Sequence, residues 1–253
     1  MLTLYYLPLR ARGEAIRLIL AYGEIPYKNI VVDFPTWTTL KGDTVRFPFS
    51  QLPVLELPSG LHLAQSGAIL RYISKLANVI PEDPERAAVA DMVLETAMEM
   101  NPINPILNFF PIGSDLHNST YATYFAALPA RLTSLQNILN DDLYFGGDKI
   151  SHGDFLLFHI LDNTVLVKPD ALADFPKLVE WKERVGSIPQ IKKYLELNPN
   201  VLVTDYLRFI WISNGKIKEA MAGMANTPQT VSATKAETSE WQPKIDAVGT
   251  LRA

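Results

Sequence analysis

Two short stretches, Gln51-Leu52-Pro53-Val54-Leu55 and Gln65-Ser66-Gly67-Ala68-Ile69, decide the fold of the first part of this chain. Between them lie two short apolar runs on either side of a Pro-Ser-Gly turn, so residues 54–64 are predicted to form a hairpin of two strands. The second stretch opens a run with apolar residues at helical spacing, which predicts a helix over residues 66–77. Pro53 enters a buried strand, where a turn needs its fixed φ and missing donor.

The sequence before this hairpin predicts a small α/β unit. Residues 2–7 are apolar and rich in aromatics and stop at Pro8, as a buried strand does. A helix is predicted at residues 12–22, a second strand at 27–32, and a loop with one short helix at 33–50. The resulting order β-α-β-loop-β-β-α fills residues 1–77, which we take as the first domain.

The rest of the chain predicts a second, all-helical domain. A proline-punctuated linker is expected at residues 78–84 and the helical domain at 85–212. Helices are predicted at residues 87–100, 121–139, 151–166, 176–187 and 189–196. Pro102 and Pro105 interrupt the chain after the first of these, so that helix must kink or end there. Ser151 and Asp154 form a capping-box pattern ahead of an apolar run.

Residues 213–253 differ from everything before them, because they are small, polar and aperiodic. Trp241 is their one aromatic residue. This C-terminal extension is either flexible or docked onto the body of the protein, and its role is not predicted.

Composition excludes several functional classes. The 253 residues include no cysteine, which excludes a disulfide framework, a thiolate zinc site, an iron–sulfur cluster and a cysteine nucleophile. The net charge of −4 argues against nucleic acid or an anionic membrane as partner. No apolar run approaches the ~18–20 residues of a membrane span. The start of the chain carries no secretion signal, so we expect a soluble, cytoplasmic protein. The four histidines lack metal-ligand spacing, and we expect no metal.

The opening of the chain, Tyr6-Leu7-Pro8-Leu9-Arg10-Ala11-Arg12 followed by a helix, resembles that of the tyrosine-using cytosolic glutathione transferases (mu, pi, alpha and sigma). The two stretches quoted first match that family's glutathione-site signatures in order and in spacing. The resemblance covers residues 1–212 and is absent from the tail. It implies a thioredoxin-like domain that binds glutathione, followed by an all-helical domain with a pocket for a hydrophobic electrophile.

The resemblance also implies roles for individual residues. Tyr6 and Arg12 would activate the glutathione thiol, and a cis Leu52–Pro53 bond would present the Leu52 backbone to the bound peptide. The remaining glutathione contacts implied are Gln51 in the first signature, Gln65 and Ser66 for the γ-glutamyl end, Trp37 and Lys41 for the glycine end, and Glu99 of a partner subunit for the amino group.

Alternative, purely structural roles for these residues remain open beside the roles that the resemblance implies. Ser66 can be a plain N-cap, Pro53 an ordinary trans proline, and Lys41 a solvated charge. Glu99 can face solvent, and Glu95 competes for its role. Tyr5 and Tyr6 point to opposite faces of a strand, and the register Tyr-x-Pro-x-Arg-x-Arg selects Tyr6.

A single tyrosine hydroxyl is about sufficient for the implied chemistry. A free thiol has a pKa of ~8.5, and lowering it by about two units requires about 2.7 kcal/mol of selective thiolate stabilisation. One hydrogen bond to a charged partner contributes roughly 1.5–3 kcal/mol. Glutathione is then a co-substrate, and no cofactor is expected.

The resemblance further implies a homodimer, in which Phe49 corresponds to the aromatic that plugs a neighbouring subunit's pocket. The expected function is conjugation of glutathione to hydrophobic electrophiles. Two alternatives remain: a glutathione-dependent isomerase of the prostaglandin synthase kind, and a non-catalytic carrier of hydrophobic ligands or structural protein on the same fold.

Overall fold

A four-stranded mixed sheet forms the centre of the first domain in the computed structural model, which describes residues 1–198. Its strands are β1 (Leu2–Tyr6), β2 (Tyr27–Val31), β3 (Val54–Glu56) and β4 (His62–Ala64). They lie in the order β2-β1-β3-β4, with β1 parallel to β2 and antiparallel to β3, and β3 antiparallel to β4. The predicted thioredoxin-like domain, including its hairpin, is therefore confirmed.

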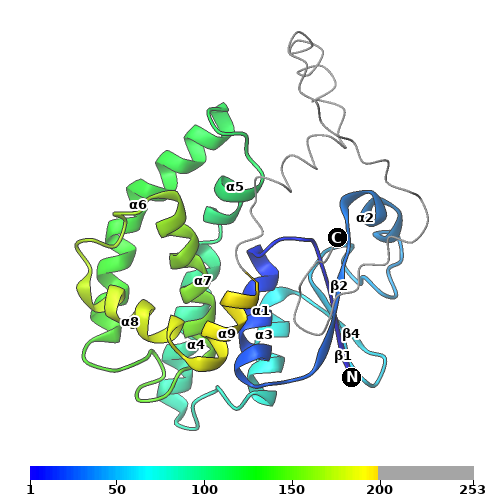
Figure 1. Cartoon of the computed structure of the whole chain (residues 1–253), viewed down its shortest axis with the longest axis horizontal. Helices are drawn as coiled ribbons and strands as arrows, with labels where there is room; N and C mark the ends of the chain where they lie inside the picture. The colour runs from blue at the N-terminus through cyan, green and yellow to red at the C-terminus, as the bar shows by residue number, and fades with distance from the viewer. Residues whose placement is uncertain (199–253) are drawn as a thin grey trace.

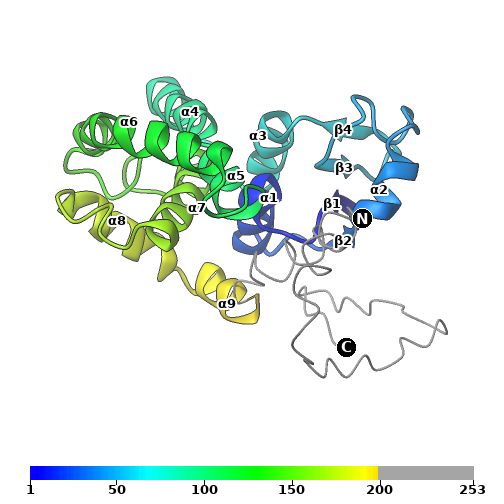
Figure 2. The same cartoon turned by 90° about the horizontal axis from the view of Figure 1, so that it is seen from above.

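Two helices cover one face of this sheet. They are α1 (Ala11–Tyr22) and α3 (Ser66–Leu76), which lie between the sheet and the second domain (Figure 2). The buried side chains of α1 recur at helical spacing, as with Ile16, Ile19 and Leu20, so this helix packs its apolar face inward. The short helix expected in the loop is α2 (Phe34–Leu40), on the opposite side of the sheet (Figure 2).

The second domain is all-helical in the described part of the chain (Figure 1). Its helices are α4 (Pro84–Glu99), α5 (Ile103–Asn108), α6 (Asp115–Leu139), α7 (His152–Val167), α8 (Pro176–Gly186) and α9 (Pro189–Leu197). Helix α7 is buried along most of its length and packs closely on α4. Gly153 permits that approach, because a Cβ there would lie 2.4 Å from the carbonyl oxygen of Ala90.

Helix α5 was not predicted, and the largest boundary differences are at the starts of two other helices, both because of caps. Helix α4 begins at Pro84, since the Asp83 carboxylate accepts the backbone N–H of Arg86 at 2.9 Å, which shortens the linker. Helix α6 begins at Asp115 rather than at residue 121, since the Ser114 hydroxyl accepts the N–H of His117. The break at Pro102 is confirmed, because α5 is separate from α4. The predicted helical sequence after residue 198 and the extension over 213–253 lie outside the described residues.

The capping box at the start of α7 is confirmed and lies wholly in the core. The Asp154 carboxylate accepts the backbone N–H of Ser151 at 2.8 Å and that of Phe145 at 3.0 Å. It also accepts the Ser151 hydroxyl at 2.5 Å and the indole N–H of Trp181 at 2.8 Å. One carboxylate thus joins α7, α8 and the loop between α6 and α7.

An ion-pair network holds the two domains together beside the end of β1. Arg10 donates to Glu14 on α1 and to Asp162 on α7, each at 3.0 Å. The Tyr194 hydroxyl of α9 donates to the same Glu14 at 3.2 Å. The loop that follows Tyr6 is therefore fixed against the helical domain. No helix within residues 1–198 combines the length and apolar character needed to cross a membrane.

Candidate active site

Tyr6 is the last residue of β1 and is 4% exposed. Its hydroxyl oxygen accepts the backbone N–H of Arg12, in the first turn of α1, at 3.0 Å. Gly13 makes room for the ring, because a Cβ there would lie 2.4 Å from Tyr6 Cδ1. The strand end and the helix start therefore hold this hydroxyl in one position.

The Tyr6 hydroxyl is protonated at neutral pH. Burial raises the pKa of Tyr6 to about 12, against the smaller lowering effects of the Arg17 charge and the Arg12 backbone N–H. No residue within 1–198 accepts a hydrogen bond from this hydroxyl. Its proton is thus available to an acceptor from outside the chain, such as a thiolate.

Arg12 contributes its backbone rather than its side chain to this arrangement. The Arg12 side chain is exposed and forms no ion pair or hydrogen bond with another described residue. The cation against the ring is instead Arg17, whose guanidinium carbon lies 5.6 Å from the Tyr6 ring centroid. Sequence reasoning missed both Arg17 and Gly13. Their spacing of four on α1, which puts them on one helix face, is the signal that could have linked them.

Tyr5 points to the other side of the sheet, as strand alternation predicts. Its hydroxyl donates to the Glu56 carboxylate at 2.7 Å, and its ring packs edge-on against Phe47 with centroids 5.8 Å apart. The hydroxyl proton of Tyr5 is therefore already used within the chain, whereas that of Tyr6 is not.

The two signature stretches come together at the start of α3. The side-chain amide of Gln65 donates to Gln51 Oε1 at 3.4 Å. The Leu52–Pro53 bond is cis, as expected, and the backbone N–H and C=O of Leu52 form no hydrogen bond with another described residue. An extended peptide can pair with such a free backbone segment.

The alternative in which Ser66 is the N-cap is wrong. Gln65 occupies the cap position with φ of 70° and makes no capping hydrogen bond through its side chain. Ser66 is the first helical residue and is buried. The first N–H groups of α3 thus lack a side-chain cap, and a helix N-terminus in that condition favours a carboxylate.

Trp37 lies in the middle of α2, and Lys41 follows the last residue of this helix. The Trp37 ring packs edge-on against Phe47 at 5.1 Å between centroids, and the Lys41 N–H donates to the Trp37 carbonyl at 2.9 Å. The Lys41 ammonium is exposed and has no ion-pair partner in the described part of the chain.

The two carboxylates considered on α4 both have partners in this chain. Glu99, the last residue of α4, is exposed and lies 3.6 Å from Arg131 of α6. Glu95 forms an ion pair with Arg71 of α3, which also bonds Asp91 at 2.9 Å. The Glu99–Arg131 ion pair is longer than the Glu95–Arg71 pair and lies at the surface. It therefore restrains the Glu99 side chain less than Arg71 restrains Glu95.

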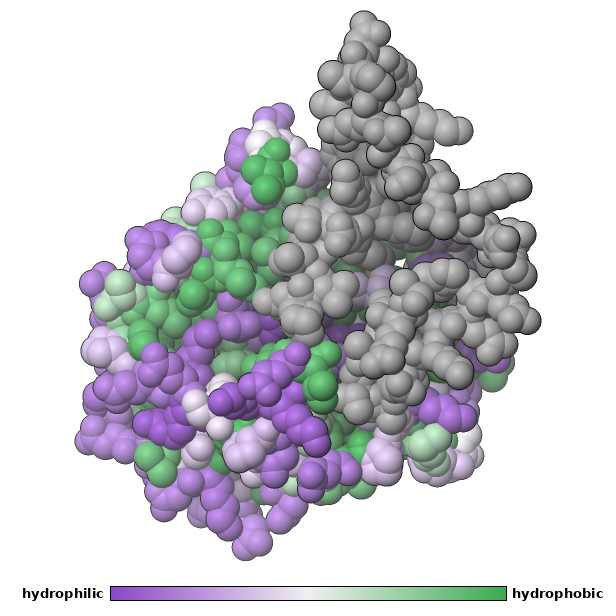
Figure 3. All heavy atoms as spheres, in the orientation of Figure 1, coloured by the Kyte–Doolittle hydropathy of each residue, from purple (hydrophilic) through white to green (hydrophobic). Residues whose placement is uncertain are grey.

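The helical domain reaches the site through Phe109, at the end of α5. Tyr6, Leu9 and Ala11 form a small buried apolar cluster, and Leu52 and Phe109 pack against it. Sequence reasoning predicted the break at Pro102 and Pro105 ahead of this segment but did not single out Phe109. Hydrophobic residues form a patch on the face of the helical domain that is turned to the viewer in Figure 3.

Phe49 lies in the loop before Gln51 and is 61% exposed. It belongs to no apolar cluster among residues 1–198, unlike the neighbouring Phe47, which is fully buried. Within the same residues, no group of three or more His, Cys, Asp or Glu side chains is placed to hold a metal ion.

Comparison with known families agrees with this geometry. The family model for the glutathione S-transferase N-terminal domain matches residues 1–75, and that for the C-terminal domain of the same family matches residues 115–198. Hematopoietic prostaglandin D synthase of Rattus norvegicus is 31% identical over 201 residues, which cover 78% of this chain and 96% of that protein.

Two further relatives extend the comparison. A glutathione S-transferase of Plasmodium falciparum is 31% identical over 208 residues, covering 77% of this chain and 94% of that protein. Among solved structures, the monomeric Na-GST-3 of the hookworm Necator americanus superposes with a TM-score of 0.70 at 27% identity. That match covers 78% of this chain and 97% of the hookworm protein.

Proposed function

The chain belongs to the glutathione S-transferase family, and from that premise we propose that Tyr6 is its catalytic residue. The protein is a glutathione transferase, which conjugates glutathione to hydrophobic electrophiles. The observation that carries the assignment of Tyr6 is its buried, protonated hydroxyl, whose proton no described residue accepts.

The chemistry requires only that the thiolate be favoured over the thiol. The Tyr6 hydroxyl donates to the glutathione sulfur, and this hydrogen bond strengthens when the sulfur loses its proton. Because Tyr6 is buried in an apolar cluster, the bond is stronger there than in water. The thiolate then attacks the electrophile, forming the carbon–sulfur bond as the leaving group departs with its electron pair. Glutathione acts as co-substrate, and we propose no resident metal or redox cofactor.

Glutathione would lie along the signature residues, of which Gln51 and Gln65 are exposed. Its γ-glutamyl carboxylate would meet the uncapped start of α3 at Gln65 and Ser66, with Gln51 beside it. Its backbone would pair with Leu52, ahead of cis Pro53. Trp37 and Lys41 would take the glycine carboxylate, since the Lys41 ammonium has no competing ion pair in residues 1–198. The Arg12 side chain, exposed beside Tyr6, would add positive potential at the sulfur.

The test is conjugation of glutathione to a chloro-dinitrobenzene electrophile by wild type, Tyr6→Phe and Tyr5→Phe. Tyr5→Phe is the matched control, because it removes a hydroxyl from the adjacent residue on the opposite face. We expect the rate to fall about tenfold or more in Tyr6→Phe and to stay within about twofold in Tyr5→Phe. Equal losses in both variants would overturn the assignment.

A glutathione-dependent isomerase is the second candidate, because the rat relative is a prostaglandin D synthase. The two activities differ in their use of glutathione, which a transferase consumes and an isomerase returns. Formation of prostaglandin D from its endoperoxide, with the glutathione concentration unchanged, would establish the isomerase activity in this chain. Absence of that product while conjugation proceeds would exclude it.

We also propose a homodimer in which Phe49 is buried by the partner and Glu99 approaches the partner's glutathione. The exposed Phe49 ring supports this, since a large exposed apolar side chain is suited to burial in an interface. One structural relative is described as monomeric, so gel filtration with light scattering decides the question. A dimer that Phe49→Ser converts to a monomer is expected, and a monomeric wild type would refute the proposal.

The proposed location is the cytoplasm, in keeping with the cytosolic transferases that the sequence resembles. Fractionation of cells that express the full chain tests it, with activity expected in the soluble cytosolic fraction.

A further inference from the structure

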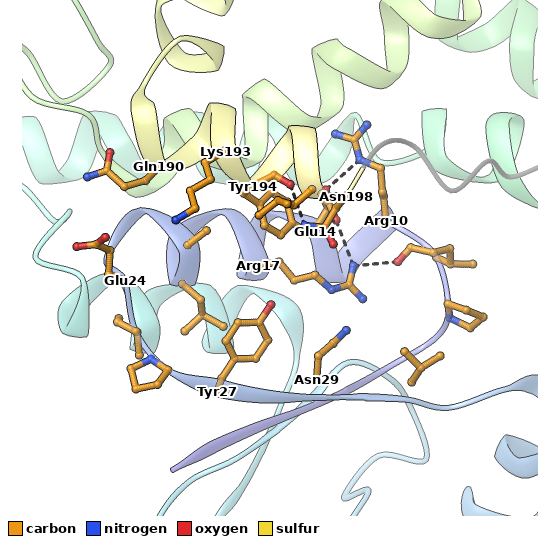
Figure 4. A pocket seen from close by; sticks show the side chains of 18 of the residues that line it. Arg10, Glu14, Arg17, Glu24, Tyr27, Asn29, Gln190, Lys193, Tyr194 and Asn198 are labelled. Carbon is orange, nitrogen blue, oxygen red and sulfur yellow. Dashed lines mark hydrogen bonds and ion pairs between the residues drawn. The ribbon is translucent and has the colours of Figure 1, made fainter. Parts of the chain in front are cut away.

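Arg17 lies in the middle of α1 and is only 8% exposed, although its guanidinium group carries a full charge. Its Nη1 atom donates to the Leu9 carbonyl and to the Glu14 carboxylate, each at 3.1 Å (Figure 4). The guanidinium carbon lies 5.6 Å from the centroid of the Tyr6 ring. One buried cation is therefore held both beside the ring of Tyr6 and against the loop that follows β1.

Two arginines lie close to Tyr6, and they differ in their exposure to water. The Arg12 side chain is exposed, so water and dissolved ions screen its charge from the Tyr6 hydroxyl. The charge of the buried Arg17 acts through a medium of lower effective dielectric constant. Burial raises the pKa of Tyr6 to about 12, and the Arg17 charge is the largest of the influences that oppose this rise. Arg17 is thus the cation that affects the Tyr6 hydroxyl most strongly.

The groups that surround Arg17 keep a constant charge while a thiol ionises. Burial raises the pKa values of Tyr27 and Tyr194 and lowers that of His159 to about 3. The two neighbouring arginines hold the pKa of Glu14 below its usual value in spite of its burial. The charged and titratable groups that face Arg17 come from β1, α1, β2, α7, α9 and the loop after β1: Tyr6, Arg10, Glu14, Tyr27, His159 and Tyr194. Between pH ~5 and ~9 none of these changes its charge, so Arg17 presents a fixed positive potential.

We propose that Arg17 is a positioning residue for catalysis, which makes Tyr6 a stronger hydrogen-bond donor to the glutathione sulfur. The inference rests on the proposed role of Tyr6. When the phenol proton is shared with a thiolate, negative charge grows on the phenol oxygen, and a cation fixed beside the ring stabilises that charge. The hydrogen bond to the Leu9 carbonyl and the ion pair with Glu14 keep the guanidinium group in this position.

The test is the pKa of the glutathione thiol bound to the full chain, followed by the ultraviolet absorbance of the thiolate. Arg17→Gln removes the charge but keeps a side-chain donor, and Arg17→Lys keeps the charge. We expect the thiol pKa to rise by about 0.5–1 pH unit in Arg17→Gln and by less than about 0.3 in Arg17→Lys. Arg17→Met makes the same comparison if Arg17→Gln does not fold. An equal thiol pKa in wild type and the uncharged variant would overturn the proposal.

Tyr194→Phe is the matched control for damage to the surrounding network. The Tyr194 hydroxyl donates to the same Glu14 carboxylate at 3.2 Å, so its removal costs that carboxylate one hydrogen bond and leaves the cation at the Tyr6 ring. We expect a thiol pKa within about 0.2 pH units of wild type in this variant. A shift as large as that of Arg17→Gln in Tyr194→Phe or in Arg17→Lys would show that packing and not charge is responsible, and would overturn the proposal.

Repeating the substitution in the Tyr6→Phe background separates this inference from the proposed function. If Arg17 acts through Tyr6, Arg17→Gln should shift the thiol pKa by less than about 0.2 pH units once the hydroxyl is gone. An equal shift with and without the hydroxyl would overturn the role of Arg17 and leave that of Tyr6 intact. A thiol pKa that Tyr6→Phe itself leaves unchanged would instead overturn the proposed role of Tyr6, and this inference with it.

Discussion

Tyr6 and Asp154 are both buried polar groups that accept backbone N–H groups at the start of a helix, yet they are satisfied to different degrees. Asp154 accepts four hydrogen bonds from the chain itself. The Tyr6 hydroxyl accepts one, from Arg12, and its proton has no acceptor in the described residues. A polar group that serves folding uses its full hydrogen-bonding capacity, whereas one that serves catalysis keeps part of it for the substrate.

The largest effect that follows is on stability, in Asp154→Ala. The substitution leaves the buried N–H groups of Phe145 and Trp181 without an acceptor, at roughly 1–3 kcal/mol each, and removes a helix cap. We expect the free energy of unfolding to fall by about 3–5 kcal/mol in urea titration. Asp170→Ala, at an exposed aspartate, is the control and should change it by less than about 0.5 kcal/mol. Asp154 is assigned to folding and not to catalysis. A folded Asp154→Ala variant with lower conjugation activity per molecule would refute that assignment.

The converse effect is expected for Tyr6→Phe. Loss of one hydrogen bond to a charged sulfur is worth roughly 1.5–3 kcal/mol in the transition state, a fall of about 10–100-fold in kcat. The free energy of unfolding should change by no more than about 1 kcal/mol, because only the Arg12 N–H loses a partner. Steady-state kinetics and urea titration of the same preparation measure both quantities. If Tyr6→Phe loses stability but keeps its kcat, Tyr6 serves folding and not catalysis, which contradicts the account.

Gly13→Ala tests whether the position of the Tyr6 ring matters as much as its hydroxyl. The added methyl group would lie 2.4 Å from Tyr6 Cδ1, so the ring must move. We expect kcat to fall about tenfold with the tyrosine still present. The control is Gly42→Ala, at a glycine with open space around its Cβ position, which should leave kcat unchanged. Wild-type kcat in Gly13→Ala would mean that the ring position is not critical.

The smallest effect concerns pH. Because burial raises the pKa of Tyr6 to about 12, its hydroxyl stays protonated through the range in which the bound thiol ionises. The rate should therefore rise with pH as the thiolate forms and then stay level to about pH 10. The free energy of unfolding is also affected only at high pH. Because an unfolded tyrosine ionises near pH ~10 and the folded Tyr6 only at a higher pH, Tyr6 lowers the stability of the fold only above pH ~10. A rate that declines between about pH 8 and 9.5 would contradict this protonation state.

The fold could be predicted from the sequence to the extent that its signals are local. The hairpin, the capping box at Ser151 and the break at Pro102 depend on neighbouring residues and are confirmed. The start of α6 was not predicted, because its first turns after Ser114 are mostly polar and lack apolar residues at helical spacing.

The site divides in the same way. Strand alternation is enough to separate Tyr6 from Tyr5, and their hydroxyls do have different surroundings. The contributions of Gly13, Arg17 and Phe109 arise from contacts between elements, so no local pattern contained them. Ser66 is the opposite case. The local pattern allowed Ser66 to be the N-cap of α3, but in the structure Gln65 occupies the cap position and Ser66 is the first helical residue.

The pKa of the glutathione thiol bound to wild type and to Tyr6→Phe, followed by the ultraviolet absorbance of the thiolate, tests the central claim most directly. If the free proton of Tyr6 stabilises the thiolate, the bound thiol should ionise about one to two pH units higher in the variant than in wild type. Identical pKa values for the two enzymes would contradict the account and assign thiolate stabilisation to another group.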